Sequence, residues 1–201
     1  FSDWIYEFNW ERNNISYKTN LNKDQLNSAS DQIKDYFKND QEKIKISVVQ
    51  SGRTILNLFN QREIDHMIDV KNLVKTTLLF EKISLFFIFF FFVIISYKNG
   101  FKKLFRFLYK TVYKSLLIWS GIFLIILSGI IINFNASFIL FHKILFRNDL
   151  WILDPRTDYL LMMFPERFFL EVCLAILFIF VIINFLIFIT SYLLDRKLNP
   201  R

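Results

Sequence analysis

Apolar residues gather in three long stretches of this chain that contain no Asp, Glu, Lys, Arg or His. Residues 115–141 and 172–194 form two of them, with 27 and 23 positions, and residues 83–97 form the third, with 15. A helix needs about 20 apolar residues to cross the hydrocarbon core of a bilayer. The pattern therefore excludes a soluble globular enzyme. It predicts three transmembrane helices, over residues 76–97, 115–141 and 168–194.

The part of the chain before the first span shows the shorter periodicities of a folded domain. Apolar residues recur at helical spacing at Leu26, Ala29, Ile33 and Phe37. Asn22, followed three residues later by Gln25, would cap such a helix. We therefore predict an amphipathic helix that buries one face in this region.

An alternating segment follows this helix. Apolar residues take every second position at Ile44, Ile46 and Val48, as in a half-buried strand. Ser51–Gly52 then indicates a turn, and Thr54–Phe59 is typical of a returning strand. Asn60 with Glu63 three residues later marks the start of a helix that leads into the first span. Residues 1–75 are therefore predicted to form a small α+β cap.

The net charge of +7 is unevenly placed. Segment 98–114 holds six basic residues and no acid, and the tail 195–201 has three basic residues against one acid. Because Lys and Arg near span ends stay cytoplasmic, we predict a basic cytoplasmic loop and a cytoplasmic tail at these segments. Segments 1–75 and 142–167 are then extracytoplasmic. The basic cluster would face anionic lipid, and we expect no nucleic-acid partner.

This topology places about 75 leading residues outside the cell. Nothing before them has the composition of a signal peptide or a span, and the chain begins with Phe1 instead of Met. We therefore expect a fourth, N-terminal span in the parent gene product. The fold class predicted from sequence is a mainly α, polytopic membrane protein with a small extracytoplasmic α+β cap.

Only two histidines occur in the chain, and both lie near the outer ends of predicted spans. His66 precedes the first span by about ten residues, and His142 directly follows the second. Two independent segments thus bring an imidazole to the same interface. General acid–base chemistry on an ester or an amine is conceivable there.

On a helix, Arg62, Asp65, His66 and Asp69 would form one polar stripe. Asp69 could orient the ring of His66, and Arg62 could meet an anionic group. The alternative is a solvated helix face with surface ion pairs, and spacing alone does not separate the two interpretations.

His142 has an equally plain alternative, as an interfacial anchor beside Phe141 and Lys143. Five charged residues follow it, namely Arg147, Asp149, Asp154, Arg156 and Asp158. Charges against a bilayer are costly unless they are paired or used in function. Structural pairing within a surface loop explains them as well as a catalytic role does.

A metal site and a serine nucleophile are both poorly supported. Glu63, His66 and His142, with Asp69 or Asp154, could supply ligands, but no His-Glu-x-x-His motif is present. The single cysteine, Cys173, lies inside a span, and no Gly-x-Ser-x-Gly occurs. We expect no metal and no other cofactor. The few charges inside the spans give no polar pathway for a transporter.

Three segments resemble the motifs of one bacterial membrane family. They are Glu63-Ile64-Asp65-His66-Met67-Ile68-Asp69-Val70-Lys71, then Phe141-His142-x-x-x-Phe146-x-Asn148-Asp149-x-Trp151-x-Leu153-Asp154-Pro155-x-Thr157-Asp158, and Phe164-Pro165-Glu166-x-Phe168-Phe169. The family is the lipoprotein intramolecular transacylases of low-GC Gram-positive bacteria. The resemblance covers roughly residues 20–194 in the same order. Family members carry four spans, so the missing N-terminal span is the one departure.

The resemblance implies an acyltransferase in the cell membrane with its active site at the extracytoplasmic face. Such enzymes move the sn-2 acyl chain of a diacylglyceryl-modified lipoprotein cysteine to the α-amine of that cysteine. The product is the lyso form, an N-acyl, S-monoacylglyceryl lipoprotein. The partners implied are diacylglyceryl-modified lipoproteins and membrane lipid, and we expect a monomer.

The family's two functional histidines match His66 and His142. We expect His142 to act as base and His66, oriented by Asp69 or Glu63, to polarise the ester carbonyl, although the two roles could be exchanged. Nucleophile and ester belong to one molecule, so no acyl-enzyme is needed. Arg62, Arg147 and Arg156 are expected to hold ester or peptide carbonyls, and a supporting role is also expected for Asp154.

Two other functions are compatible with the same sequence. One is a non-catalytic membrane protein that binds lipid or a lipoprotein partner through the cap. The other is a membrane hydrolase that uses a metal or the histidine pair.

Overall fold

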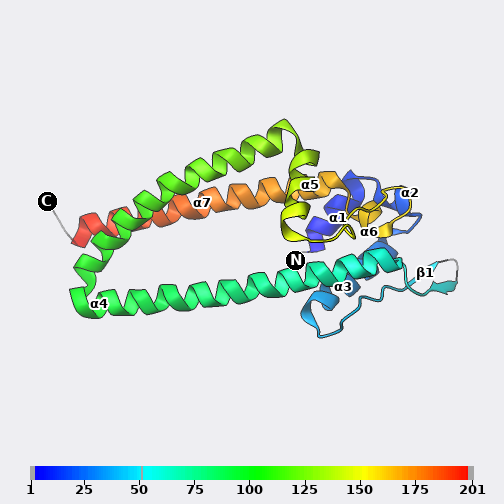
Figure 1. Cartoon of the computed structure of the whole chain (residues 1–201), viewed down its shortest axis with the longest axis horizontal. Coiled ribbons are helices and arrows are strands. Elements are labelled where there is room, and N and C mark those ends of the chain that lie inside the picture. Colours follow the sequence, from blue (N-terminus) through cyan, green and yellow to red (C-terminus); the bar gives the residue numbers. More distant parts are fainter. Residues whose placement is uncertain (1–2, 51, 199–201) are drawn as a thin grey trace. The chain divides into compact units, whose positions relative to one another are not determined.

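The computed structural model describes residues 3–50 and 52–198 (Figure 1). Its helices are α1 (Asp3–Arg12), α2 (Ile15–Thr19), α3 (Lys23–Lys38), α4 (Gln61–Ile132), α5 (Phe134–Leu145), α6 (Tyr159–Met163) and α7 (Glu166–Leu198). Its strands are β1 (Val48–Gln50) and β2 (Arg53–Ile55). The chain divides into two compact units. The cap unit comprises Phe1–Thr77 with Phe138–Phe169, and the span unit comprises Leu78–Ser137 with Leu170–Arg201.

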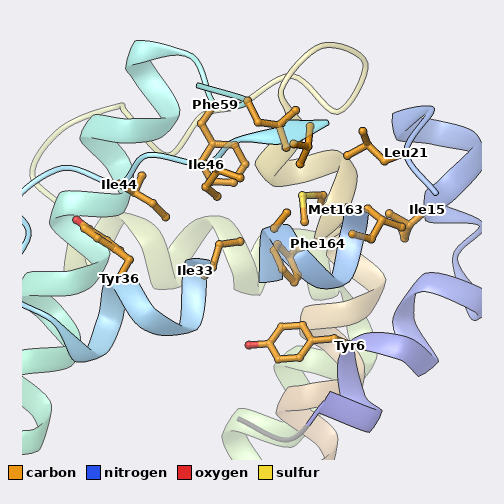
Figure 2. Close-up of a cluster of buried hydrophobic side chains, with 14 of the residues drawn as sticks. Tyr6, Ile15, Leu21, Ile33, Tyr36, Ile44, Ile46, Phe59, Met163 and Phe164 are labelled. Atoms are coloured by element: carbon orange, nitrogen blue, oxygen red, sulfur yellow. The ribbon is translucent and has the colours of Figure 1, made fainter. Parts of the chain in front are cut away.

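The cap unit has one hydrophobic core, to which α1, α3, the segment before β1 and the end of α6 all contribute. Figure 2 shows the side chains of this core, including Ile33, Ile44, Ile46, Met163 and Phe164. The capping box predicted at the start of α3 is confirmed. The Asn22 side chain accepts from the Gln25 amide at 2.9 Å, and the Gln25 side chain accepts from the Asn22 amide at 2.7 Å.

The amphipathic face of α3 follows the predicted spacing with one shift. Leu26, Ala29 and Ile33 are buried, as predicted. Tyr36 takes the last buried position, because its hydroxyl donates to the Glu42 carbonyl at 2.9 Å, and Phe37 is only partly buried. The core therefore includes a tyrosine ring whose hydroxyl group is hydrogen-bonded.

The two predicted strands exist but are shorter than the alternation indicated. β1 pairs antiparallel with β2, with Val48 opposite Ile55 and Gln50 opposite Arg53. Ile44 and Ile46 are buried, yet they precede the strand. The reason is that the Gln32 side chain of α3 binds both backbone groups of Ser47, at 2.9 Å each, in place of a neighbouring strand.

The second strand ends early for a backbone reason. Asn57 has a φ of 63°, a left-handed conformation that interrupts the ladder two residues after Ile55. The chain nevertheless stays beside its partner, since the Leu58 amide donates to the Ile46 carbonyl at 2.8 Å. The prediction of a strand over Thr54–Phe59 was therefore wrong in extent, although the hairpin itself is confirmed.

Among the described residues, three helices are long and apolar enough to cross a membrane, namely Gln61–Lys98, Gly100–Ile132 and Glu166–Leu198. The first has 38 residues and is therefore about 57 Å long, against about 30 Å of hydrocarbon. Its first 15 residues, 61–75, contain six charged side chains and His66. We therefore treat residues 61–75 as the part of α4 that precedes the span.

The basic segment 98–114, predicted as a loop, is helical in the structure. Only Gly100 leaves the helical conformation, with φ 71° and ψ 160°, and it divides α4 into two long helices. On the second helix, Lys103, Lys110 and Lys114 share one face, while Leu104 is fully buried. Residues 101–114 thus form part of an amphipathic helix, a pattern that a count of charges does not reveal.

The predicted span over 115–141 is interrupted at Asn133, between α4 and α5. The Asn133 side chain accepts from the Ala136 amide at 2.9 Å and so caps α5. As a result, His142 lies in the last turn of α5 and not in a loop after a span. The fold class is otherwise as predicted, with mainly α structure, three long apolar helices and one small sheet.

Candidate active site

His66 and His142 face each other within the cap unit. Their ring centroids lie 6.1 Å apart, with an angle of 40° between the ring planes. Each residue is only 7% exposed. Two imidazoles from α4 and α5 therefore form one buried pair.

The first turns of α4 are held by a buried carboxylate, Glu63, which is 1% exposed. One oxygen of Glu63 accepts from the Asn60 amide at 2.7 Å, and the other accepts from the Leu160 amide at 2.6 Å. The bond to Asn60 confirms the predicted helix start, and the bond to Leu160 connects α4 to α6. His66 follows Glu63 by three residues, so this contact fixes the helical turn that carries it.

A second buried carboxylate, Asp158, also joins the start of α4 to the segment before α6. Its Oδ1 accepts from the Asn60 side chain at 2.9 Å, and its Oδ2 accepts from the Asp154 amide at 2.7 Å. Burial raises the pKa of Glu63, backbone hydrogen bonds from Leu160 and Asn60 oppose this shift, and the charge of Asp158 adds to it. We call the set Asn60, Glu63, Asp158 and Leu160 the carboxylate clamp.

His142 lies among aromatic rings. Its ring centroid is 4.2 Å from that of Phe138, 5.0 Å from Trp151 and 5.7 Å from Phe146. Its Nδ1 lies 2.7 Å from the Phe138 carbonyl oxygen. Burial lowers the pKa of His142, and the hydrogen bond to Phe138 opposes that shift.

His66 is even less able to carry a charge. Burial, together with the neighbouring His142, lowers the pKa of His66 to about 4, although Asp69 opposes the shift. Its Nδ1 is buried and has no hydrogen-bond partner among the described residues. Phe146 packs its edge against the same ring, at 5.3 Å between centroids. Burial therefore favours the neutral form of both imidazoles.

Polar contacts join α4 to the loop after α5 beside this pair. The Asn148 side chain donates to Asp69 Oδ2 at 2.8 Å, and the Arg62 guanidinium donates to the Asp149 carbonyl. The Trp151 indole donates to the Asn148 carbonyl at 2.8 Å. These bonds fix the loop that covers His142.

Two of the residues expected to support the site pair with each other at the surface instead. Asp154 and Arg156 form an ion pair with each other, with 2.7 Å between Oδ2 and Nη2. The Arg156 side chain is 85% exposed, and its guanidinium lowers the pKa of Asp154 to about 2. Arg147 is also exposed. The structure thus places Asp154 and Arg156 in a paired surface turn, as the plainer sequence interpretation had it.

Neither carboxylate expected to orient His66 does so in the described part of the chain. The oxygens of Glu63 accept backbone amides of the clamp, and Asp69 accepts Asn148. Within residues 3–50 and 52–198, no group of three or more His, Cys, Asp or Glu side chains is arranged to hold a metal ion.

Sequence reasoning named several residues that build the site without giving them a role in it. They are Asn60 and Asp158 of the clamp, Asn148 beside Asp69, and the rings of Phe146 and Trp151. All but Asn60 belong to the long motif that begins at Phe141. The signal was therefore present, but only the tertiary structure shows which motif members contact the histidines.

A sequence model of one protein family, described as lipoprotein intramolecular transacylase Lit, matches residues 1–169. This chain belongs to the lipoprotein intramolecular transacylase family. The match confirms the resemblance, although it begins before residue 20 and ends before residue 194, the two bounds that we expected.

Solved structures agree with this assignment. The membrane-integral lipoprotein intramolecular transacylase of Bacillus cereus is 26% identical, with a TM-score of 0.68 over 98% of this chain and 83% of that one. Two variants of that protein, in which one histidine is replaced by arginine or by alanine, give TM-scores of 0.65 and 0.63 at 25% identity. The comparison with curated proteins finds no match.

The chain is therefore an enzyme, a lipoprotein transacylase with a membrane-integral fold. Its family acts on lipoproteins, which confirms the expected class of substrate. The three apolar helices identify a membrane protein.

Proposed function

We propose that this transacylase moves the sn-2 acyl chain of a diacylglyceryl-modified lipoprotein to the α-amine of its N-terminal cysteine. The product would be the N-acyl, S-monoacylglyceryl form. The observation that carries the proposal is the buried pair of His66 and His142, in which burial favours the neutral form of each ring. An amine that attacks an ester needs a base for its proton and a donor for the developing oxyanion.

His142 is the base in this proposal, because its tautomer leaves one nitrogen free. A carbonyl oxygen only accepts hydrogen bonds, so the Nδ1 that faces the Phe138 carbonyl must carry the proton. Nε2 of the neutral ring is then the unprotonated nitrogen. It can accept a proton from the attacking amine.

His66 is the electrophilic partner in this proposal. Its Nδ1 is buried without a partner, and a buried N–H left unpaired is costly. The tautomer with the proton on Nε2 avoids that cost. Such an N–H can donate to the carbonyl oxygen of the ester and to the oxyanion that forms from it.

The transfer balances without a covalent enzyme intermediate. The nitrogen bonds to the acyl carbon, and the bond between that carbon and the sn-2 glycerol oxygen breaks. If the amine enters as ammonium, two protons leave the nitrogen. His142 passes one to the glycerol oxygen, and the other goes to solvent. Because nucleophile and ester belong to one substrate, holding both in place supplies much of the rate acceleration.

The surroundings support acyl transfer over hydrolysis. Phe138, Phe146 and Trp151 pack around His142, and closely packed rings leave little room for water beside the ester. The carboxylate clamp would hold His66 in register with the loop. Of the three arginines, Arg62 is bound to the loop that covers His142, so we propose it ahead of Arg147 and Arg156 for holding a substrate carbonyl.

We further propose that the protein is a monomeric multi-pass membrane protein with this site at the extracytoplasmic face. Lipoprotein N-termini and their acyl chains are found there at the bilayer surface. The charged segment 61–75 and the histidine pair would then lie just outside the hydrocarbon core.

The test is mass spectrometry of a reporter lipoprotein from a host that lacks N-acylation and expresses the full-length protein. The proposal predicts one acyl chain on the α-amine and one left on glycerol. Unchanged diacylglyceryl-cysteine, with the protein folded and inserted, would instead favour a protein that binds lipoproteins without turning them over.

A further inference from the structure

Asp69 lies beside the histidine pair, but the mechanism proposed above gives it no role. It follows His66 by three residues on α4, so both side chains share one face of the helix. Its Oδ2 accepts from the Asn148 side chain at 2.8 Å, and Asn148 belongs to the loop that covers His142. The carboxylate therefore lies at the edge of the buried pair, facing the same loop.

This carboxylate lacks a cation. No Lys, Arg or His of the described chain forms an ion pair with Asp69. The nearest candidate on the same face, Arg62, donates to the Asp149 carbonyl instead. A cationic partner would stabilise this carboxylate through a charge-assisted hydrogen bond. Asp69 is half-buried and so remains accessible to a ligand.

The proposed substrate brings one cation to this place. An α-amino group has a pKa near 8, so the cysteine nitrogen arrives mainly as ammonium at pH 7. The same nitrogen becomes positive again when it bonds to the acyl carbon. A carboxylate beside it stabilises both the bound ammonium and the positive nitrogen of the transition state.

We propose that Asp69 binds the α-ammonium of the lipoprotein cysteine and so positions the nucleophile between His66 and His142. This inference rests on the proposed function and names the group that holds one end of its substrate. It assigns Asp69 to the substrate instead of to the ring of His66. Asn148 then has a positioning role, since it fixes the carboxylate by occupying Oδ2.

Binding of two non-reacting lipopeptides to the full-length protein at pH 7 tests this directly. Both carry ether-linked chains, which cannot be transferred, and one has a free α-ammonium while the other is N-acetylated. We expect the wild-type protein to bind the ammonium form about tenfold more tightly. Equal binding of the two forms would overturn the proposal, and this comparison needs no variant to fold.

Variants then assign the preference to one residue. Asp69→Asn keeps an oxygen for Asn148 but loses the charge, so it should remove the preference, and Asp69→Glu should restore most of it. Asp65→Asn is the matched control one turn earlier, where Asp65 accepts from Gln61. It should bind as the wild type does. A preference that survives in Asp69→Asn, or that is lost in Asp65→Asn, would contradict the assignment.

Different experimental results would show that this inference is wrong and that the proposed function is wrong. If Asp69 has another role, the wild-type protein still produces N-acylated reporter while showing no preference for the ammonium form. If the proposed function is wrong, no N-acylated reporter forms at all.

Discussion

The rings of His66 and His142 lie 6.1 Å apart, centroid to centroid, and the packing around each of them excludes charge. The chain thus brings two imidazoles, from α4 and α5, into one buried pair. Each side chain is fixed differently, His142 by the Phe138 carbonyl and His66 by the turn of α4 that the clamp anchors.

Replacing either histidine should abolish most of the transacylation. His142→Ala removes the base and His66→Ala removes the oxyanion donor, and loss of one such group lowers a rate by about 10²–10⁴-fold. The measurement is the fraction of N-acylated reporter lipopeptide per unit of inserted enzyme. Lys143→Ala, an exposed neighbour of His142, serves as the control and should leave the rate unchanged. Near-wild-type turnover in either histidine variant would refute the role given to that residue.

Glu63→Gln should destabilise the cap unit. Both oxygens of Glu63 accept backbone amides, so the NH₂ of a glutamine would face an N–H in one of the two places. Leaving such groups unpaired costs about 2–4 kcal/mol of the free energy of unfolding. Unfolding by SDS titration checks this, with Gln61→Ala in the same turn as a control that should change stability by less than about 0.5 kcal/mol. A loss for Glu63→Gln no larger than that of the control would mean that the clamp is not structural.

Lowering the pH should destabilise the protein, because the buried ring of His66 must then take up a proton. Its pKa is about 4 in the folded state, below the usual 6.5, because burial disfavours the charged ring. A lowered folded pKa gives stability that is fully present above pH 6.5 and is lost as the pH falls toward 4. About 2 kcal/mol should be lost between pH 7 and pH 5.

The measurement is the free energy of unfolding at both pH values, for the wild type and for His66→Gln. The variant lacks the titrating ring, so it should lose distinctly less stability than the wild type over this interval. Equal losses in the two proteins would show that other groups cause the acid sensitivity.

Trp151→Ala should shift the pH dependence of the rate. The indole ring packs 5.0 Å from the ring of His142, and its removal admits water to that ring. The pKa of His142, which burial lowers, should then rise toward 6.5. Since the base acts only when it is neutral, the variant should lose activity at a higher pH than the wild type does.

Single-turnover rates from pH 5 to 8 measure this shift. Trp151→Phe, which keeps a ring in place, should resemble the wild type in its acid limb. An unchanged acid limb in Trp151→Ala would mean that burial by the indole does not set the pKa of His142.

Much of the fold was predictable because its signals are local. Long charge-free stretches identify the three apolar helices, and the polar pairs Asn22–Gln25 and Asn60–Glu63 identify two helix starts. The errors arose from one tertiary contact and one local helix cap. The Gln32 side chain takes the backbone of Ser47 and shortens β1, while the break at Asn133 divides a predicted span and places His142 on a helix.

The sequence predicted the two histidines of the candidate site but not the residues that surround them. His66 and His142 were indicated by rarity and by resemblance, and the structure does bring them together. The aromatic rings and Asp158 carry no distinctive spacing, so their contacts follow only from the folded loop. Glu63 was expected at the ring of His66, but its oxygens bind backbone amides of the cap.

The most direct test of the central claim uses the purified full-length enzyme and a lipopeptide whose sn-2 chain alone is deuterated. The readout is the mass of the N-terminal lipopeptide after incubation. The account predicts that the wild type moves the deuterated chain to the α-amine, and that the His66→Ala, His142→Ala double variant leaves it on glycerol. Transfer of the unlabelled sn-1 chain, or equal transfer by the double variant, would contradict it.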